Sequence, residues 1–186
     1  MSENVITRQG KAIEAPSILT RLFTDVRFAI LWLPIRVWLG MQWVEAGLHK
    51  LPDPAWMKTG VALKGFWTGA IQVPAEGRPP IAYAWYREFL EAALNAQAYT
   101  WFAKVVVIGE LLIGIALILG VFVGLTAFFA GFMNWNFIMA GSAGVNGMFF
   151  GLAVLLVLAW KIAGYFGLDY FLLPRVSALW SKFKTK

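Results

Sequence analysis

The 186-residue sequence contains no cysteine and only one histidine, His49. The lack of cysteine excludes disulfides, thiol relays and thiolate-bound metals within this chain. A single histidine also excludes bis-histidine haem ligation by this chain alone. The sequence carries no haem, flavin or metal motif. Electron transfer involving this chain would therefore need a partner protein or a direct exchange between bound molecules.

Charge is missing over a long stretch, because the fifty residues from Leu111 to Trp160 include no Asp, Glu, Lys, Arg or His. As one helix this run would be about 75 Å long, whereas a hydrocarbon core is roughly 30 Å thick. It must therefore fold back within lipid. The chain is 60% hydrophobic and has ten Trp and fifteen Phe, which is typical of membrane helices with aromatic anchors. The sequence predicts an integral membrane protein.

Apolar runs predict four membrane-spanning helices, at about 29–48, 101–121, 125–140 and 148–166. Glycines mark short turns between the second and third runs and between the third and fourth. Short turns force neighbouring helices to be antiparallel, and helices satisfy their own backbone polar groups in lipid. The expected fold class is an all-α integral membrane protein, an antiparallel four-transmembrane-helix bundle.

We expect three parts: an N-terminal tail and lead-in (1–28), a membrane domain (29–168) and a basic amphipathic C-terminal tail (169–186). The net charge of +6 lies largely outside the apolar runs. The basic tail residues are Arg8, Lys11, Arg21, Arg27, Arg175, Lys182, Lys184 and Lys186. The expected location is a bacterial or archaeal cell membrane. The positive-inside rule places both termini in the cytoplasm and loop 49–100 outside. Such charge indicates contact with anionic lipid rather than with nucleic acid.

Two segments outside the spans predict helices that lie on the membrane surface. In loop 49–100, Asp53-Pro54 is typical of a helix start, and the stretch from Pro74 to Pro80 breaks the chain before an aromatic segment. We therefore expect two short amphipathic helices over the mouth of the bundle. At the other end, a helical stripe predicts an interfacial anchor, formed by Val176, Leu179, Trp180 and Phe183.

Charged and polar residues inside the apolar spans are costly in lipid and are therefore the candidates for function. They are Arg36, Glu45, His49, Lys50, Glu110, Asn134 and Asn136. Glu110 lies near mid-span, and we expect it to face Arg36 or Asn136 inside the bundle. Arg36 and Glu110 form either a structural ion pair that fixes helix register or part of a site for a polar head group such as a quinone carbonyl.

The other candidates leave similar alternatives open. Glu45 and His49 lie four residues apart and share a helix face. His49 is either an interfacial histidine or a proton donor and acceptor. Asn134 and Asn136 point to different sides of their helix, so one can bond between helices while the other reaches a cavity. Trp56 and Lys50 lie where the first span leaves the membrane, as belt residues or as part of a substrate mouth.

Five short segments occur in the order of a known pattern, at 36–51, 53–56, 109–120, 133–137 and 163–169. They include Arg36-Val37-Trp38-Leu39-Gly40, Gly109-Glu110-Leu111 and Met133-Asn134-Trp135-Asn136-Phe137. Over about residues 30–175 the chain resembles the DoxX/DoxD family. The resemblance implies a four-helix membrane protein linked to sulfur and redox metabolism. One branch of that family is the small subunit of thiosulfate:quinone oxidoreductase, and others accompany membrane oxidoreductase assemblies.

Two functions follow as hypotheses. The first is a quinone-interacting subunit of a membrane oxidoreductase. Its expected catalytic residues are Glu110, His49 and Glu45, its quinone-binding residues are Arg36, Asn134, Asn136 and Trp56, and Lys50 would bind an anionic substrate such as thiosulfate. The second is a non-catalytic scaffold or accessory subunit of a larger respiratory complex. Expected partners are membrane lipid and other subunits of a membrane redox complex, and no metal site is expected. A small-solute transporter is disfavoured because no inverted repeat is evident.

Overall fold

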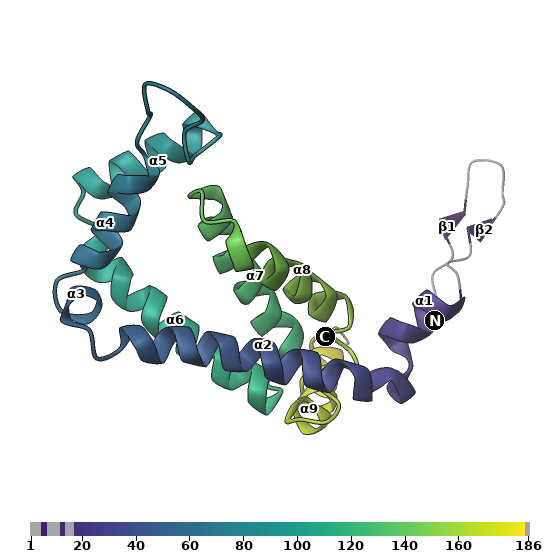
Figure 1. Cartoon of the computed structure of the whole chain (residues 1–186). Helices are drawn as coiled ribbons and strands as arrows, with labels where there is room; N and C mark the ends of the chain where they lie inside the picture. Colours follow the sequence, from purple (N-terminus) through teal and green to yellow (C-terminus); the bar gives the residue numbers. More distant parts are fainter. Residues whose placement is uncertain (1–4, 7–11, 14–16, 185–186) are drawn as a thin grey trace.

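The computed structural model describes residues 5–6, 12–13 and 17–184 (Figure 1). Within this part, the only strands are two-residue segments paired antiparallel, β1 (Val5–Ile6) and β2 (Ala12–Ile13). Everything else of regular structure is helical, so the all-α fold class is confirmed there. The helices are α1 (Ser17–Thr24), the 3-10 helix η1 (Val26–Phe28), α2 (Ala29–Lys50), α3 (Pro54–Met57), α4 (Val61–Ala70), α5 (Ala84–Asn95), α6 (Tyr99–Leu119), α7 (Val123–Met139), α8 (Gly144–Leu158) and α9 (Asp169–Lys184).

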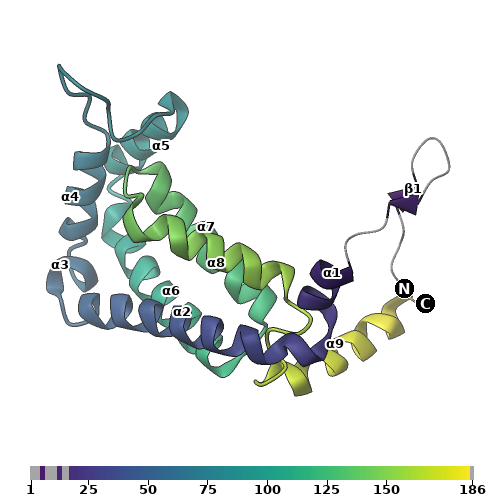
Figure 2. The ribbon, with the colours of Figure 1, turned by 45° about the vertical axis from the view of Figure 1, so that its right-hand side comes forward.

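Helices α2 and α6 form one close antiparallel pair (Figure 2). A side chain added at Gly40 would come within 2.9 Å of the Gly114 carbonyl oxygen, and one at Gly47 would press on Leu111. Residues later in α2 contact residues earlier in α6, so the two helices run antiparallel. The glycines thus let the two backbones approach to contact distance.

Helices α7 and α8 form a second antiparallel pair, in which Gly124 meets Trp160 and Gly131 meets Ala153. Small buried residues such as Ala127 and Ala130 fill the core between the pairs, together with Leu117 and Leu156. Helix α7 also packs against α6. The two pairs together make a four-helix arrangement.

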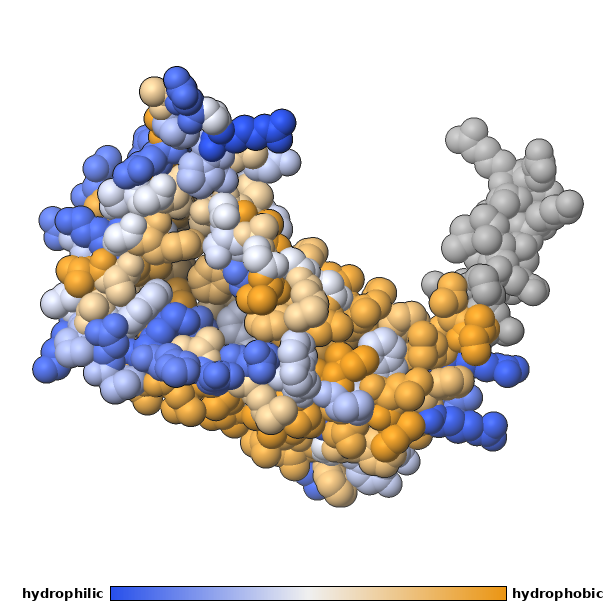
Figure 3. Space-filling view, in the orientation of Figure 1, coloured by the Kyte–Doolittle hydropathy of each residue, from blue (hydrophilic) through white to orange (hydrophobic). Residues whose placement is uncertain are grey.

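The outer surface of this arrangement is largely apolar. On α6 the exposed side chains include Val105, Ile108, Leu112 and Ile115. Hydrophobic residues cover the lower middle of the molecule in Figure 3, whereas hydrophilic ones gather towards the end that carries α3, α4 and α5. Within the described residues, α6 is the one helix both long and apolar enough to cross a membrane, and α7 and α8 are shorter apolar helices.

Loop 49–100 folds into a cap of three helices, α3, α4 and α5, rather than the two expected. The helix start at Asp53 is confirmed, since its carboxylate accepts from the Ala55 N–H at 2.8 Å. The extra break falls at Gly60, whose φ of 74° is left-handed and whose α-hydrogens face the Tyr99 backbone, leaving no room for a side chain. Cap residues Leu63 and Leu90 belong to a separate small core that includes Ala103 of α6.

The helix expected over the fourth predicted span, 148–166, is too long. Helix α8 ends at Leu158, and 159–166 form a series of turns whose backbone bonds span three or four residues. These turns bring the Phe166 carbonyl oxygen to the guanidinium of Arg36, which a continued helix could not do. The predicted C-terminal helix is present as α9, but the side chains of 179–184 lie outside the described part. The basic residues Arg8, Lys11 and Lys186 lie outside it as well.

Candidate functional site

A cavity of about 320 Å³ lies between the four long helices and the cap. Helix α2 and the cap form one side of it, and α6, α7 and α8 supply the rest. We call it the bundle cavity. It is lined by Gln42, Trp43, Ala46, Lys50, Trp56, Phe66, Glu110, Asn134, Phe137, Ser142, Val145, Asn146 and Phe149.

An ion pair between α2 and α6 forms part of the wall of the bundle cavity. The Lys50 ammonium donates to both carboxylate oxygens of Glu110, at 2.7 and 2.8 Å, and also to the Ala46 carbonyl at 3.3 Å. The Glu110 residue is 1% exposed. Because Lys50 also lies 5.3 Å from the ring centroid of Trp56, its charge is held between a carboxylate and an aromatic face.

Two other side chains of the bundle cavity are buried without hydrogen-bond partners in the described part of the chain. Neither the amide nitrogen nor the amide oxygen of Asn134 is paired, although the residue is 0% exposed. The indole N–H of Trp43, itself 4% exposed, is also unpaired. Buried polar groups are nearly always satisfied, so three unpaired atoms around one cavity call for a specific explanation. A bound polar group would supply their partners.

The chemistry of the bundle cavity combines flat apolar walls with a few polar groups. Five aromatic side chains line it: Trp43, Trp56, Phe66, Phe137 and Phe149. Pockets of this kind bind an apolar ring and orient it through a small number of hydrogen bonds. The carboxylate of Glu110 and the ammonium of Lys50 are the groups there that can hold or release a proton.

Four of the residues singled out from the sequence meet in the bundle cavity: Lys50, Trp56, Glu110 and Asn134. Trp43 was not among the candidates predicted from the sequence. Helical spacing indicates its position, since Trp43, Ala46 and Lys50 share a face of α2. Tracing that face back from Lys50 would have identified the tryptophan.

The expected pairing of Glu110 with Arg36 or Asn136 is wrong, because Glu110 pairs with Lys50. Arg36 lies 14 residues before Lys50 on α2, about 20 Å away along the axis. Its guanidinium donates to the Phe166 carbonyl at 3.2 Å and is attracted to Asp169. It therefore ties α2 to the chain before α9, away from the bundle cavity.

Asp169 completes that structural contact. Its carboxylate oxygens accept from the backbone N–H groups of Phe122 and Val123, at 2.6 and 2.8 Å. These are at the beginning of α7, so a negative charge is placed on a helix N-terminus. Asp169 thus fastens the α6–α7 turn to the start of α9, and Arg36 lies within range of its charge.

Asn136 also lies outside the lining of the bundle cavity. Its amide nitrogen donates to the Phe132 carbonyl at 2.8 Å, and the Tyr86 hydroxyl donates to its backbone and side-chain oxygens at 3.1 and 3.2 Å. Burial raises the pKa of Tyr86 to about 12. Asn136 thus joins the cap to α7, whereas Asn134 faces the bundle cavity, as their two-residue spacing predicted.

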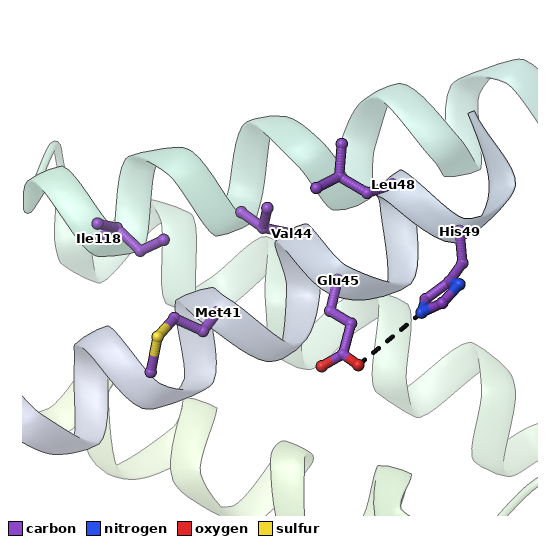
Figure 4. A pocket seen from close by; sticks show the side chains of 6 residues that line it. All are labelled: Met41, Val44, Glu45, Leu48, His49 and Ile118. Atoms are coloured by element: carbon purple, nitrogen blue, oxygen red, sulfur yellow. Dashed lines mark ion pairs between the residues drawn. The ribbon is translucent and has the colours of Figure 1, made fainter. Parts of the chain in front are cut away.

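Glu45 and His49 lie on the outer surface of α2. Figure 4 shows their side chains directed at each other from successive turns, with His49 Nε2 3.8 Å from Glu45 Oε1. Their side chains are 64% and 79% exposed, respectively. They border a surface hollow with Met41 and Ile118. The structure therefore does not bring the expected group of Glu110, His49 and Glu45 together.

Among the described residues, no group of three or more His, Asp or Glu side chains is placed to hold a metal ion. Comparisons of the chain with protein-family models, curated proteins and solved structures found no match.

Proposed function

We propose that this chain is the membrane subunit of a quinone-linked oxidoreductase or respiratory assembly and takes a quinone head group into the bundle cavity. The observation that carries the proposal is the set of unpaired buried polar atoms on Asn134 and Trp43, beside the Lys50–Glu110 ion pair. The resemblance to the DoxX/DoxD family points to the same class of assembly. A sulfur compound such as thiosulfate is then the original electron donor.

The proposal places α2, α6, α7 and α8 across the membrane, with the cap outside and both termini in the cytoplasm. The apolar side chains exposed on α6, such as Leu112, support this arrangement because lipid would cover them. Helix α6, with 21 residues, is about 32 Å long, which matches a hydrocarbon core of roughly 30 Å. Helix α8, with 15 residues, is about 23 Å long, so the turns that follow it would complete the crossing.

A quinone fits the bundle cavity by shape and by hydrogen bonding. The aromatic walls accept the ring, and Trp43 and Asn134 donate to a carbonyl oxygen. Reduction of the quinone takes two electrons and two protons. The electrons come from a redox subunit of the assembly, and protons reach the ring past Glu110 and Lys50. Since the charge of Lys50 is already balanced by Glu110, the bundle cavity suits an uncharged ring better than an anion.

The test is purification of the assembly from native membranes, followed by extraction and identification of bound quinone. We expect quinone in amounts matching this chain. Glu110→Gln should lower quinone reduction while the chain stays in the membrane. Lys161→Gln is the matched control, since Lys161 is exposed and contacts Trp160 outside the bundle cavity. Absence of quinone from an intact, active assembly would contradict the proposal.

A second candidate function is that of a non-catalytic scaffold, and the Glu45–His49 pair favours it. Charged side chains on the outer face of a membrane helix are costly unless another protein covers them. A neighbouring subunit against this face would remove that cost. A photo-crosslinker at Met41, which borders the Glu45–His49 pair, should then capture one subunit in stoichiometric yield. A non-catalytic accessory role predicts this capture together with no bound quinone in this chain.

A further inference from the structure

The unpaired atoms of the bundle cavity specify the hydrogen-bonding pattern of the ligand. Asn134 presents two N–H donors and one oxygen acceptor, and Trp43 presents one N–H donor. The ligand must therefore both accept and donate. This holds whichever way the amide is oriented, because both of its ends are unpaired.

The two redox forms of a quinone differ in this respect. The carbonyl oxygens of the oxidised form only accept, so they can pair with Trp43 and with the Asn134 nitrogen but leave the Asn134 oxygen unpaired. A quinol hydroxyl can accept from those donors and donate to the Asn134 oxygen. A buried acceptor that stays unpaired costs free energy, because it has lost its hydrogen bonds to water and gained none in return.

Two of the neighbouring polar groups already have partners. Both Glu110 oxygens already accept from Lys50. The Asn146 amide nitrogen donates to the Ser142 carbonyl at 2.8 Å, within its own helix start. Among the buried atoms of the bundle cavity, the unpaired acceptor is the Asn134 oxygen.

We propose that the bundle cavity binds the reduced, hydroxyl-bearing form of its quinone more tightly than the oxidised form, through Asn134. The proposal rests on the proposed function and adds a direction to it. Tighter binding of the reduced form raises the midpoint potential of the bound couple, by about 30 mV for each tenfold preference. The site then favours electron flow into the quinone.

The experiment compares the two forms on the purified full-length chain in detergent. The probes are a decyl-tailed benzoquinone and its quinol, titrated anaerobically by calorimetry. We expect about tenfold tighter binding of the quinol, the effect of pairing one buried acceptor. We prefer calorimetry to tryptophan fluorescence, because quinones would quench the emission of Trp43 and Trp56.

Two variants separate the roles of the unpaired groups. Asn134→Leu removes donor and acceptor together, so both forms should bind with similar affinity. Trp43→Phe removes only a donor, so both forms should weaken while the preference for the quinol persists. Thermal unfolding of each variant shows whether it is folded. If a variant does not fold, the comparison of quinol and quinone affinities on the unmodified chain still decides the proposal.

The outcomes are distinct. Equal affinity for the two forms, or tighter binding of the oxidised form, overturns the proposed preference and leaves quinone binding intact. A preference that survives in folded Asn134→Leu overturns the role of Asn134. Failure of both probes to bind the unmodified chain overturns the proposed function itself.

Discussion

Lys50 and Glu110, sixty positions apart, form an ion pair in which one ammonium donates to both oxygens of one carboxylate. The pair joins the end of α2 to the middle of α6. Glu110 is almost fully buried, while the Lys50 side chain is 23% exposed. The pairing links the end of α2, where the cap begins, to α6.

Breaking this pair on one side should destabilise the fold more than replacing both partners. Glu110→Gln leaves the Lys50 charge without a partner, and we expect a loss of about 3 kcal/mol in the free energy of unfolding, the low end for a buried pair because Lys50 is partly exposed. The double variant Lys50→Met with Glu110→Leu should lose less. Equilibrium unfolding in detergent of Lys50→Met, Glu110→Leu and the double variant measures the coupling. Simple additivity of the two single losses would show that the pair is not a unit.

Two glycines of α6 should respond differently to alanine. A methyl group at Gly114 would lie 2.7 Å from the Gly40 carbonyl oxygen, and backbone cannot move aside easily. At Gly109 the nearest atom is the Met133 sulfur at 3.6 Å, an ordinary contact. We expect Gly114→Ala to lower stability by about 1–3 kcal/mol, as overpacking does. Gly109→Ala should be neutral or slightly stabilising, because alanine favours a helix. Equal melting temperatures for the two variants would be evidence against close packing of α2 on α6.

Two of the aspartate helix caps, at Asp169 and Asp53, should differ in strength. Asp169 is buried and accepts two backbone N–H bonds at the start of α7, whereas Asp53 accepts one at the start of α3. We expect Asp169→Ala to lower the free energy of unfolding by about 2 kcal/mol or more, and Asp53→Ala by about 1 kcal/mol. Chemical unfolding of both variants under one condition tests the order, and a larger effect at Asp53 would reverse it.

Tyr86 should titrate at a higher pH than a free phenol. Its pKa is raised to about 12 by burial, against 10.0 for a free phenol. The folded state therefore holds the proton more tightly than the unfolded state. The stability that this supplies is complete below pH 10 and is lost as the pH rises towards 12. Alkaline titration of tyrosinate absorbance should lose its latest step in Tyr86→Phe. A late step that remains in that variant would assign it to another residue.

The proposed orientation can be tested because the chain has no cysteine of its own. Single cysteines at Gly77, exposed after α4, and at Ser177, exposed on α9, would be the sole reactive thiols. We expect an impermeant thiol reagent to label the first in intact cells and the second only after the membrane is opened. The reverse pattern would invert the topology.

The helices could be predicted from the sequence because the charge-free run leaves few alternatives. The cap start at Asp53 followed from local chemistry, since a capping carboxylate and Pro54 act within one turn. The end of α8 could not be read in this way. Residues 159–166 are mostly apolar, and their turns end at a hydrogen bond between Phe166 and Arg36, 130 positions away.

The partner of Glu110 could not be predicted either, because depth along a span does not give the register between two helices. That register is set by Gly40 against Gly114 and Gly47 against Leu111. The same limit applies to Glu45, which lies five residues before Lys50 and so about 140° around the helix from it. A sequence gives that angle, but it does not say which of the two faces is inward.

The contact around Asp169 also bears on how the chain is made. The N–H groups of Leu168 and Asp169 donate to the carbonyls of Leu119 and Gly120, so the α6–α7 turn is bonded to a segment that begins some fifty residues later. Until that segment has left the ribosome, the first N–H groups of α7 have no carboxylate to bind. The start of α7 therefore stays incompletely capped until Asp169 has been synthesised. Chains that stop before Asp169 would lack these two hydrogen bonds to the start of α7.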